Sequence, residues 1–119
     1  MPITDAQRLA ERCQEICLDR QGEDVRLYDV RETSLLADYY LICSANSLPH
    51  IRAISNRLLR DLGDEGVHPR SVEGAPASHW VIMDYGLVLV HLFLPDARDY
   101  YGIEALWQAD RTTNHTAEV

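Results

Sequence analysis

Two stretches decide the fold of this chain: residues 38–47, which read DYYLICSANS, and residues 80–91, which read WVIMDYGLVLVH. The run from residue 39 to residue 43 is β-prone and apolar on both faces, which is typical of a strand inside a sheet. The polar residues that follow it supply a turn and, at Ser47, a residue type that caps helix N-termini. We therefore expect an interior strand followed directly by a helix.

The second stretch predicts a β-hairpin. Two strongly β-forming runs, residues 80–84 and 87–94, are joined through the sequence DYG at 84–86. That sequence suits a three-residue loop whose glycine adopts the left-handed conformation.

The hairpin's register and its two faces follow from this loop. Met83 would face Leu87, and Trp80 would face Val90. Because both strands are apolar on both faces, the hairpin either lies between two helical layers or leaves one apolar face for a partner.

Helical patterns lie on both sides of the first stretch. Thr4 followed by Gln7 fits a capping box, and apolar residues at helical spacing continue it, so a helix is predicted over residues 4–20. A second helix is predicted over residues 47–62, with Pro49 in its first turn, where a missing N–H costs nothing. Its apolar stripe consists of Ile51, Ile54, Leu58 and Leu62.

Three weaker segments complete the pattern. Residues 25–30 alternate as a half-exposed strand would, and residues 67–72 form an extended piece that Pro69 restricts to a sheet edge. A short helical turn is expected over residues 96–101. The order α-β-β-α-β-β-β-α then predicts one α/β domain over residues 1–107, with a polar, disordered tail over residues 108–119.

Charge limits the class of partner. The chain has 19 acidic and 11 basic residues and a formal net charge of −8, which would repel a phosphate backbone and favours a basic protein partner. An exception is the stripe formed by Arg52, Asn56 and Arg60 on the second helix. It is either an ordinary solvated face or, together with Arg57, a contact surface for RNA.

The cysteines and the apolar runs indicate a cytoplasmic protein. Cys13, Cys17 and Cys43 are an odd number without a CxxC pair, and no secretory leader is evident, so reduced, buried thiols are expected. The longest apolar run, residues 87–94, is far shorter than the roughly 20 residues that a membrane-spanning helix needs. We expect a soluble protein.

Motifs for catalysis are weak. Cys43 and His91 could meet as a thiol and its base, but no orienting third group is evident. The five histidines share no metal-ligand spacing and no glycine-rich phosphate loop is present, so neither a metal nor a cofactor is expected. Nucleotidyl transfer would need paired carboxylates for two metal ions, and Asp84 stands alone. A nucleotidyltransferase-like enzyme or nucleotide-binding protein remains the alternative function.

Aromatic residues and two loop carboxylates suit a protein interface. The aromatic candidates are Trp80, Trp107, Tyr39, Tyr40, Tyr85, Tyr100 and Tyr101, and core packing explains at least half of them. Asp84 and Glu73 lie in predicted loops, where a carboxylate either satisfies a turn or meets a basic partner.

Several of these motifs together resemble the ribosomal silencing factor (Iojap-like) family. The resemblance spans residues 9–107 and rests on DYYLICSANS (38–47), VEG (72–74), WVIMDYG (80–86), Val90-His91, Tyr100-Tyr101 and Leu106-Trp107. It implies a mixed five-stranded sheet with flanking helices, related in shape to nucleotidyltransferases. It also implies binding of the large ribosomal subunit through its fourteenth protein, which would block joining of the small subunit and repress translation when nutrients are scarce.

This resemblance implies a binding role without catalysis, and often a homodimer. The acidic charge agrees with a basic ribosomal protein as the partner rather than with direct binding of nucleic acid. Within the matched motifs we expect the partner-binding surface on the hairpin, with neighbours around it. The expected contact residues are Trp80, Asp84, Tyr85 and His91, with Ser47, Glu73 and Tyr100 beside them.

Overall fold

The computed structural model describes residues 5–35, 37–74 and 79–104, which form one α/β domain. The predicted order of elements is confirmed. The elements are α1 (Ala6–Asp19), β1 (Glu23–Asp29), β2 (Tyr39–Ser44), α2 (Leu48–Asp64), β3 (Ser71–Glu73), β4 (Trp80–Asp84), β5 (Val88–Phe93) and α3 (Pro95–Tyr101). The Trp107 position and the tail at 108–119 lie outside the described residues.

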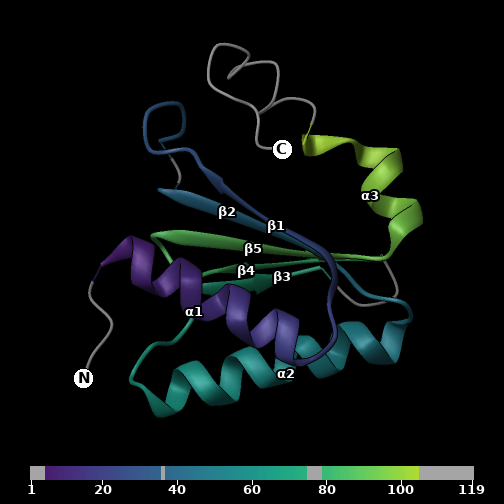
Figure 1. Cartoon of the computed structure of the whole chain (residues 1–119), viewed down its shortest axis with the longest axis horizontal. Helices are drawn as coiled ribbons and strands as arrows, with labels where there is room; N and C mark the ends of the chain where they lie inside the picture. The colour runs from purple at the N-terminus through teal and green to yellow at the C-terminus, as the bar shows by residue number, and fades with distance from the viewer. Residues whose placement is uncertain (1–4, 36, 75–78, 105–119) are drawn as a thin grey trace.

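The five strands form a single mixed sheet in the order β1-β2-β5-β4-β3. β2 and β5 pair in parallel, and the other neighbours pair antiparallel. The predicted interior position of β2 is confirmed, because all six of its residues are buried. As Figure 1 shows, α1 and α2 lie together on one face of the sheet, and α3 lies on the other side, at one end. The sheet is therefore covered unequally on its two faces.

The hairpin register differs from the predicted one by three positions. Met83 pairs with Val90, and Trp80 pairs with Phe93. Leu87 belongs to the turn rather than to β5, because its carbonyl accepts the N–H groups of Asp38 and Tyr39 at the start of β2. The connection is thus longer than the predicted three-residue loop.

The predicted left-handed glycine of this turn is confirmed. Gly86 has a φ of 85°, and its N–H donates to Oδ1 of Asp84 at 2.7 Å. The turn closes with a bond from the N–H of Tyr85 to the carbonyl of Val88 at 2.9 Å. The Asp84 carboxylate consequently has a structural task in the turn.

Helix ends follow the expected chemistry with one change. Ser47 caps α2 as predicted, accepting the N–H of His50 at 3.2 Å. The cap of α1 is Asp5, which accepts the N–H of Arg8 at 3.0 Å, and not the predicted Thr4, which lies outside the described residues. An Asp carboxylate one position later is a favoured N-cap acceptor. β3 is confirmed as an edge strand but is shorter than the predicted extended piece.

The main core lies between the sheet and the two long helices. The apolar stripes of α1 and α2 are buried against alternate residues of β2, β4 and β5. The three cysteines are free and fully buried within this core, as predicted. The core residues from the sheet are Tyr39, Leu41, Cys43, Val81, Met83, Val88, Val90 and Leu92.

Candidate functional site

The face of the sheet that points away from α1 and α2 is the candidate site. Residues alternate along each strand, so those that do not face the helices point to this side. They form two smaller apolar clusters of their own, separate from the main core. We call this side the open face and define it by Tyr28, Tyr40, Ile42, Trp80, Ile82, Asp84, Leu89, His91 and Phe93. Its members Trp80, Ile82 and Leu89 are only half-buried.

Aromatic rings gather on the open face at the end of the sheet next to α3. The Trp80 ring stacks on Phe93, with centroids 5.0 Å apart, and lies 6.0 Å from the ring of His91. From α3, Tyr101 also packs against Trp80, with centroids 4.6 Å apart. Tyr101 is 47% exposed and its neighbour Tyr100 is 83% exposed. The cluster thus combines the buried ring of Phe93 with the exposed rings of Tyr100 and Tyr101.

His91 is held neutral in this cluster. Burial lowers the pKa of His91 to about 4. The indole Nε1 of Trp80 donates to Nδ1 of His91 at 3.2 Å, so Nδ1 must be unprotonated and the neutral ring carries its proton on Nε2. The histidine therefore fixes the orientation of the tryptophan and adds no charge to the face.

Charged residues lie at one border of the open face, along β3 and β4. Oδ2 of Asp84 accepts from Nη2 of Arg70 at 3.2 Å, and the Arg70 side chain is 67% exposed. Glu73 ends the edge strand and is exposed. Both signs of charge therefore border the apolar surface.

The structure brings together some of the expected contact residues and separates others. Trp80, His91 and Asp84 share the open face, and Tyr100 is exposed on α3 beside it. Tyr85 lies in the main core on the opposite face and is only 7% exposed, with no hydrogen-bond partner for its hydroxyl among the described residues. Ser47 is committed to capping α2. We therefore leave Tyr85 and Ser47 out of the surface proposed below.

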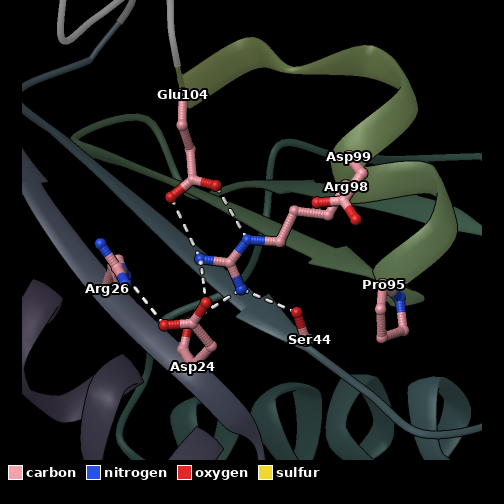
Figure 2. A pocket seen from close by; sticks show the side chains of 7 residues that line it. All are labelled: Asp24, Arg26, Ser44, Pro95, Arg98, Asp99 and Glu104. Atoms are coloured by element: carbon pink, nitrogen blue, oxygen red, sulfur yellow. Dashed lines mark hydrogen bonds and ion pairs between the residues drawn. The ribbon is translucent and has the colours of Figure 1, made fainter.

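A polar hollow lies under α3, next to the open face. It has a volume of about 270 Å³ and is lined by Asp24, Arg26, Ser44, Pro95, Arg98, Asp99 and Glu104 (Figure 2). Arg98 crosses it from α3 toward β1 and β2 and is 7% exposed. Arg98 was not among the expected site residues, because an arginine in a charged helical turn has the pattern of a solvated residue.

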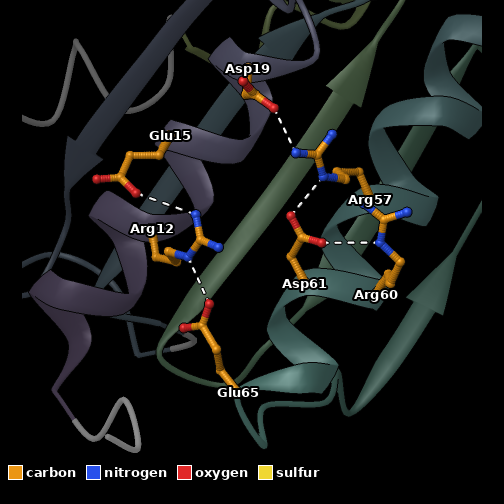
Figure 3. Close-up of polar contacts among 7 residues, drawn as sticks. All are labelled: Arg12, Glu15, Asp19, Arg57, Arg60, Asp61 and Glu65. Atoms are coloured by element: carbon orange, nitrogen blue, oxygen red, sulfur yellow. Dashed lines mark hydrogen bonds and ion pairs between the residues drawn. The ribbon is translucent and has the colours of Figure 1, made fainter.

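The arginine stripe of α2 lies on the helical side of the domain. Arg57 donates to Asp61 at 2.7 Å and to Asp19 of α1 at 2.7 Å, and Arg60 donates to Asp61 at 3.2 Å (Figure 3). These arginines therefore form ion pairs within the chain, far from the aromatic cluster.

Neither a metal cluster nor a membrane span is found in the described part of the chain. Across residues 5–35, 37–74 and 79–104, no three His, Cys, Asp or Glu side chains are grouped so that they could hold a metal ion. None of the helices described there is long and apolar enough to cross a membrane.

Comparison with known proteins decides the family. The family described as "Ribosomal silencing factor during starvation" matches residues 3–119. The chain belongs to the ribosomal silencing factor family. The resemblance expected from the residue motifs is thereby confirmed.

Relatives in this family include bacterial and plant proteins. The ribosomal silencing factor RsfS of Bacillus subtilis is 38% identical over 91 residues, which cover 76% of this chain and 77% of that protein. A chloroplastic Iojap protein of maize is 30% identical over 105 residues, which cover 88% of this chain and 44% of that protein. The bacterial relative is thus named as a ribosomal silencing factor, and the plant relative as an Iojap protein.

A solved structure shows the same fold. A crystal structure of a protein from Chromobacterium violaceum matches with a TM-score of 0.83 and 32% identity, over 87% of each chain. The mixed five-stranded sheet with flanking helices is therefore the fold shared with this relative.

Proposed function

We propose that this chain binds the large ribosomal subunit through one ribosomal protein, the fourteenth of that subunit, and sterically prevents the small subunit from joining. Translation would be repressed as a result. In this proposal the chain acts in the cytoplasm by occupying a surface and not by catalysis. The observation that carries the proposal is the open face, where an aromatic cluster with exposed tyrosine rings lies on the side of the sheet that the two long helices leave uncovered.

The composition of the open face supports a protein partner. Aromatic side chains bury a large area at low entropic cost, and they are enriched among the residues that dominate binding energy. The ring of Trp80 is already fixed by Phe93 and His91, so little side-chain freedom would be lost on binding. We propose Trp80, Ile82, Leu89 and Tyr100 as contacts, with Asp84 and Glu73 at the border.

The charge of the chain supports a basic partner. A net charge of −8 would accelerate encounter with a basic ribosomal protein, and this steering weakens as salt screens it. Bare ribosomal RNA would be repelled by the same charge. We therefore expect the chain to bind protein-bearing subunits and the isolated fourteenth protein, but not protein-free RNA.

Co-sedimentation through a sucrose gradient tests the proposal. The purified chain should migrate with large subunits and reduce the fraction of joined ribosomes when both subunits are present. Ile82→Ser, on the open face, should weaken binding about tenfold, because a central interface residue contributes more than 1 kcal/mol. Trp80→Ala should weaken it further, provided circular dichroism shows that the domain remains folded.

Leu59→Ser is a matched control for Ile82→Ser. Leu59 is an aliphatic residue on α2, 37% exposed, on the helical side of the domain. Its substitution should leave binding unchanged. Migration with small subunits alone, or equal binding by the Ile82 and Leu59 variants, would contradict the proposal.

We also propose that the free chain forms a homodimer, because an exposed apolar face is costly in water. Analytical ultracentrifugation at micromolar concentration should give twice the mass of one chain. A monomer throughout the concentration range would contradict this part of the proposal.

A further inference from the structure

The short helix α3 forms one wall of the open face. Its residue Ala97 is buried against Ile42 and Phe93 at the base of the face. Its last residue, Tyr101, lies against Trp80. The position of α3 therefore decides where the Tyr101 ring lies and how much of Trp80 is covered.

Arg98 connects this helix to three other parts of the fold. Its Nη1 donates to the carbonyl oxygen of Asp24 in β1 at 2.8 Å and to Oγ of Ser44 at the end of β2 at 2.7 Å. Its Nε and Nη2 donate to the two carboxylate oxygens of Glu104 at 2.8 and 3.1 Å. A bidentate pair of this kind fixes orientation as well as distance.

Glu104 extends the same network to the open face. Its Oε2 accepts from the hydroxyl of Tyr28 at 2.6 Å, and the Tyr28 ring packs in the clusters of the open face. Burial alone would raise the pKa of Glu104, but the hydrogen bonds from Arg98 and Tyr28 outweigh it and keep the pKa low. The carboxylate is thus ionised and binds both partners.

We propose that Arg98 is a positioning residue for partner binding: it holds α3 so that Tyr101 lies over Trp80 and completes the docking surface. Arg98 and Tyr101 are three positions apart on one helix, and side chains at that spacing lie on the same side. A shift of the Arg98 guanidinium therefore moves Tyr101. The inference rests on the proposed function, because the open face must be the docking surface.

Stability alone is a weaker explanation of this network. A buried ion pair often contributes little net stability, since desolvation offsets the attraction, whereas it specifies one geometry. Lys in place of Arg98 keeps the charge but loses the planar fork that satisfies Glu104, Ser44 and Asp24 together. Arg98→Lys is therefore the variant that separates geometry from charge.

Two measurements on folded protein test the inference. The first is acrylamide quenching of Trp80 fluorescence. The chain has two tryptophans, so this measurement uses a Trp107→Phe background in which Trp80 alone remains. The second is the affinity for purified large subunits, measured by co-sedimentation with the full chain. Arg98→Lys should increase the quenching and weaken binding about tenfold, which equals about 1.4 kcal/mol. Tyr101→Ala should weaken binding to a similar extent.

Arg57→Lys is the matched control. Arg57 also donates to two acidic groups, Asp61 and Asp19, but on the helical side of the domain (Figure 3). If losing any arginine with two acidic partners were enough to change quenching and binding, Arg57→Lys would change them too. We expect quenching of Trp80 and affinity for large subunits to remain those of the unsubstituted chain.

The outcomes are distinguishable. If folded Arg98→Lys keeps normal quenching, or binds as well as Arg57→Lys, the inference is wrong while the proposed function stands. Normal binding by Tyr101→Ala overturns it as well. If Arg98→Lys fails to fold, Glu104→Gln decides by the same criteria, because it removes the carboxylate that pairs with Arg98. Failure of the unsubstituted chain to bind large subunits would overturn the proposed function and, with it, the inference.

Discussion

Trp80 donates the N–H of its indole to Nδ1 of His91 across the β4–β5 hairpin, at 3.2 Å. A hydrogen bond of this kind requires an unprotonated imidazole nitrogen, so the conformation of the half-buried tryptophan depends on a buried histidine that must stay neutral. Protonation of His91 at Nδ1 would replace an acceptor with a donor and break the bond.

His91 should therefore make the domain less stable in mild acid. The pKa of His91 falls from 6.5 to about 4 on folding, so between these values the unfolded chain binds a proton that the folded chain does not. The free energy of unfolding should drop by about 2 kcal/mol from pH ~7 to pH ~4.5 through this residue. Urea unfolding at the two pH values measures it.

His91→Gln provides the control for this dependence. Carboxylates with lowered pKa, such as Glu104, also cost stability as the pH falls, and they do so in both proteins. The difference in slope between the two proteins therefore isolates His91. Equal slopes would show that His91 has the same pKa in the folded and the unfolded chain, which would contradict its burial as a neutral ring.

Gly22 should not tolerate a side chain. A Cβ at this position would come within 2.5 Å of Sγ of Cys43 and 2.8 Å of the carbonyl oxygen of Cys17, both in the core. Gly22→Ala should cost about 1 to 3 kcal/mol, the usual penalty for overpacking. Gly63→Ala is the matched control, because its Cβ would have ordinary contacts and Ala favours the helix by up to ~1 kcal/mol. A small or absent loss of stability in Gly22→Ala, measured by thermal unfolding, would contradict the packing.

The three thiols should be unreactive in the folded protein. Cys13, Cys17 and Cys43 are fully buried, and burial raises the pKa of Cys13 to about 12. Reagent access and thiolate formation are both suppressed under these conditions. Ellman's reagent at pH ~8 should label none of them rapidly in buffer and all of them in urea. Fast labelling of one thiol in buffer would show that the core opens near α1.

Sequence patterns predicted the fold well where local chemistry alone decides it. The run at 39–43 favoured an interior strand, and Ser47 with Pro49 favoured the start of a helix, because these local preferences need no distant partner. The hairpin register failed for the opposite reason. Leu87 has the pattern of a strand residue, but its carbonyl accepts hydrogen bonds from the N–H groups of Asp38 and Tyr39. This contact with a distant part of the chain lengthens the turn.

The candidate site was less predictable than the fold. Trp80, His91 and Tyr85 were all expected at the contact surface. Tyr85 instead points into the core, because it continues the alternation of β4, in which Val81 and Met83 face the core. Arg98 gave no signal at all, since its partners Asp24 and Ser44 lie more than fifty positions away along the chain. Burial of a charged side chain depends on tertiary contacts that one sequence does not display.

Light scattering of ribosomal subunit joining tests the central claim most directly. Large subunits are incubated with the unsubstituted chain, Ile82→Ser or Leu59→Ser, and small subunits are then added. The unsubstituted chain and Leu59→Ser should suppress the rise in scattering, and Ile82→Ser should do so only at about ten times the concentration. Undiminished joining with the unsubstituted chain, or equal suppression by both variants, would contradict the claim that the open face blocks the small subunit.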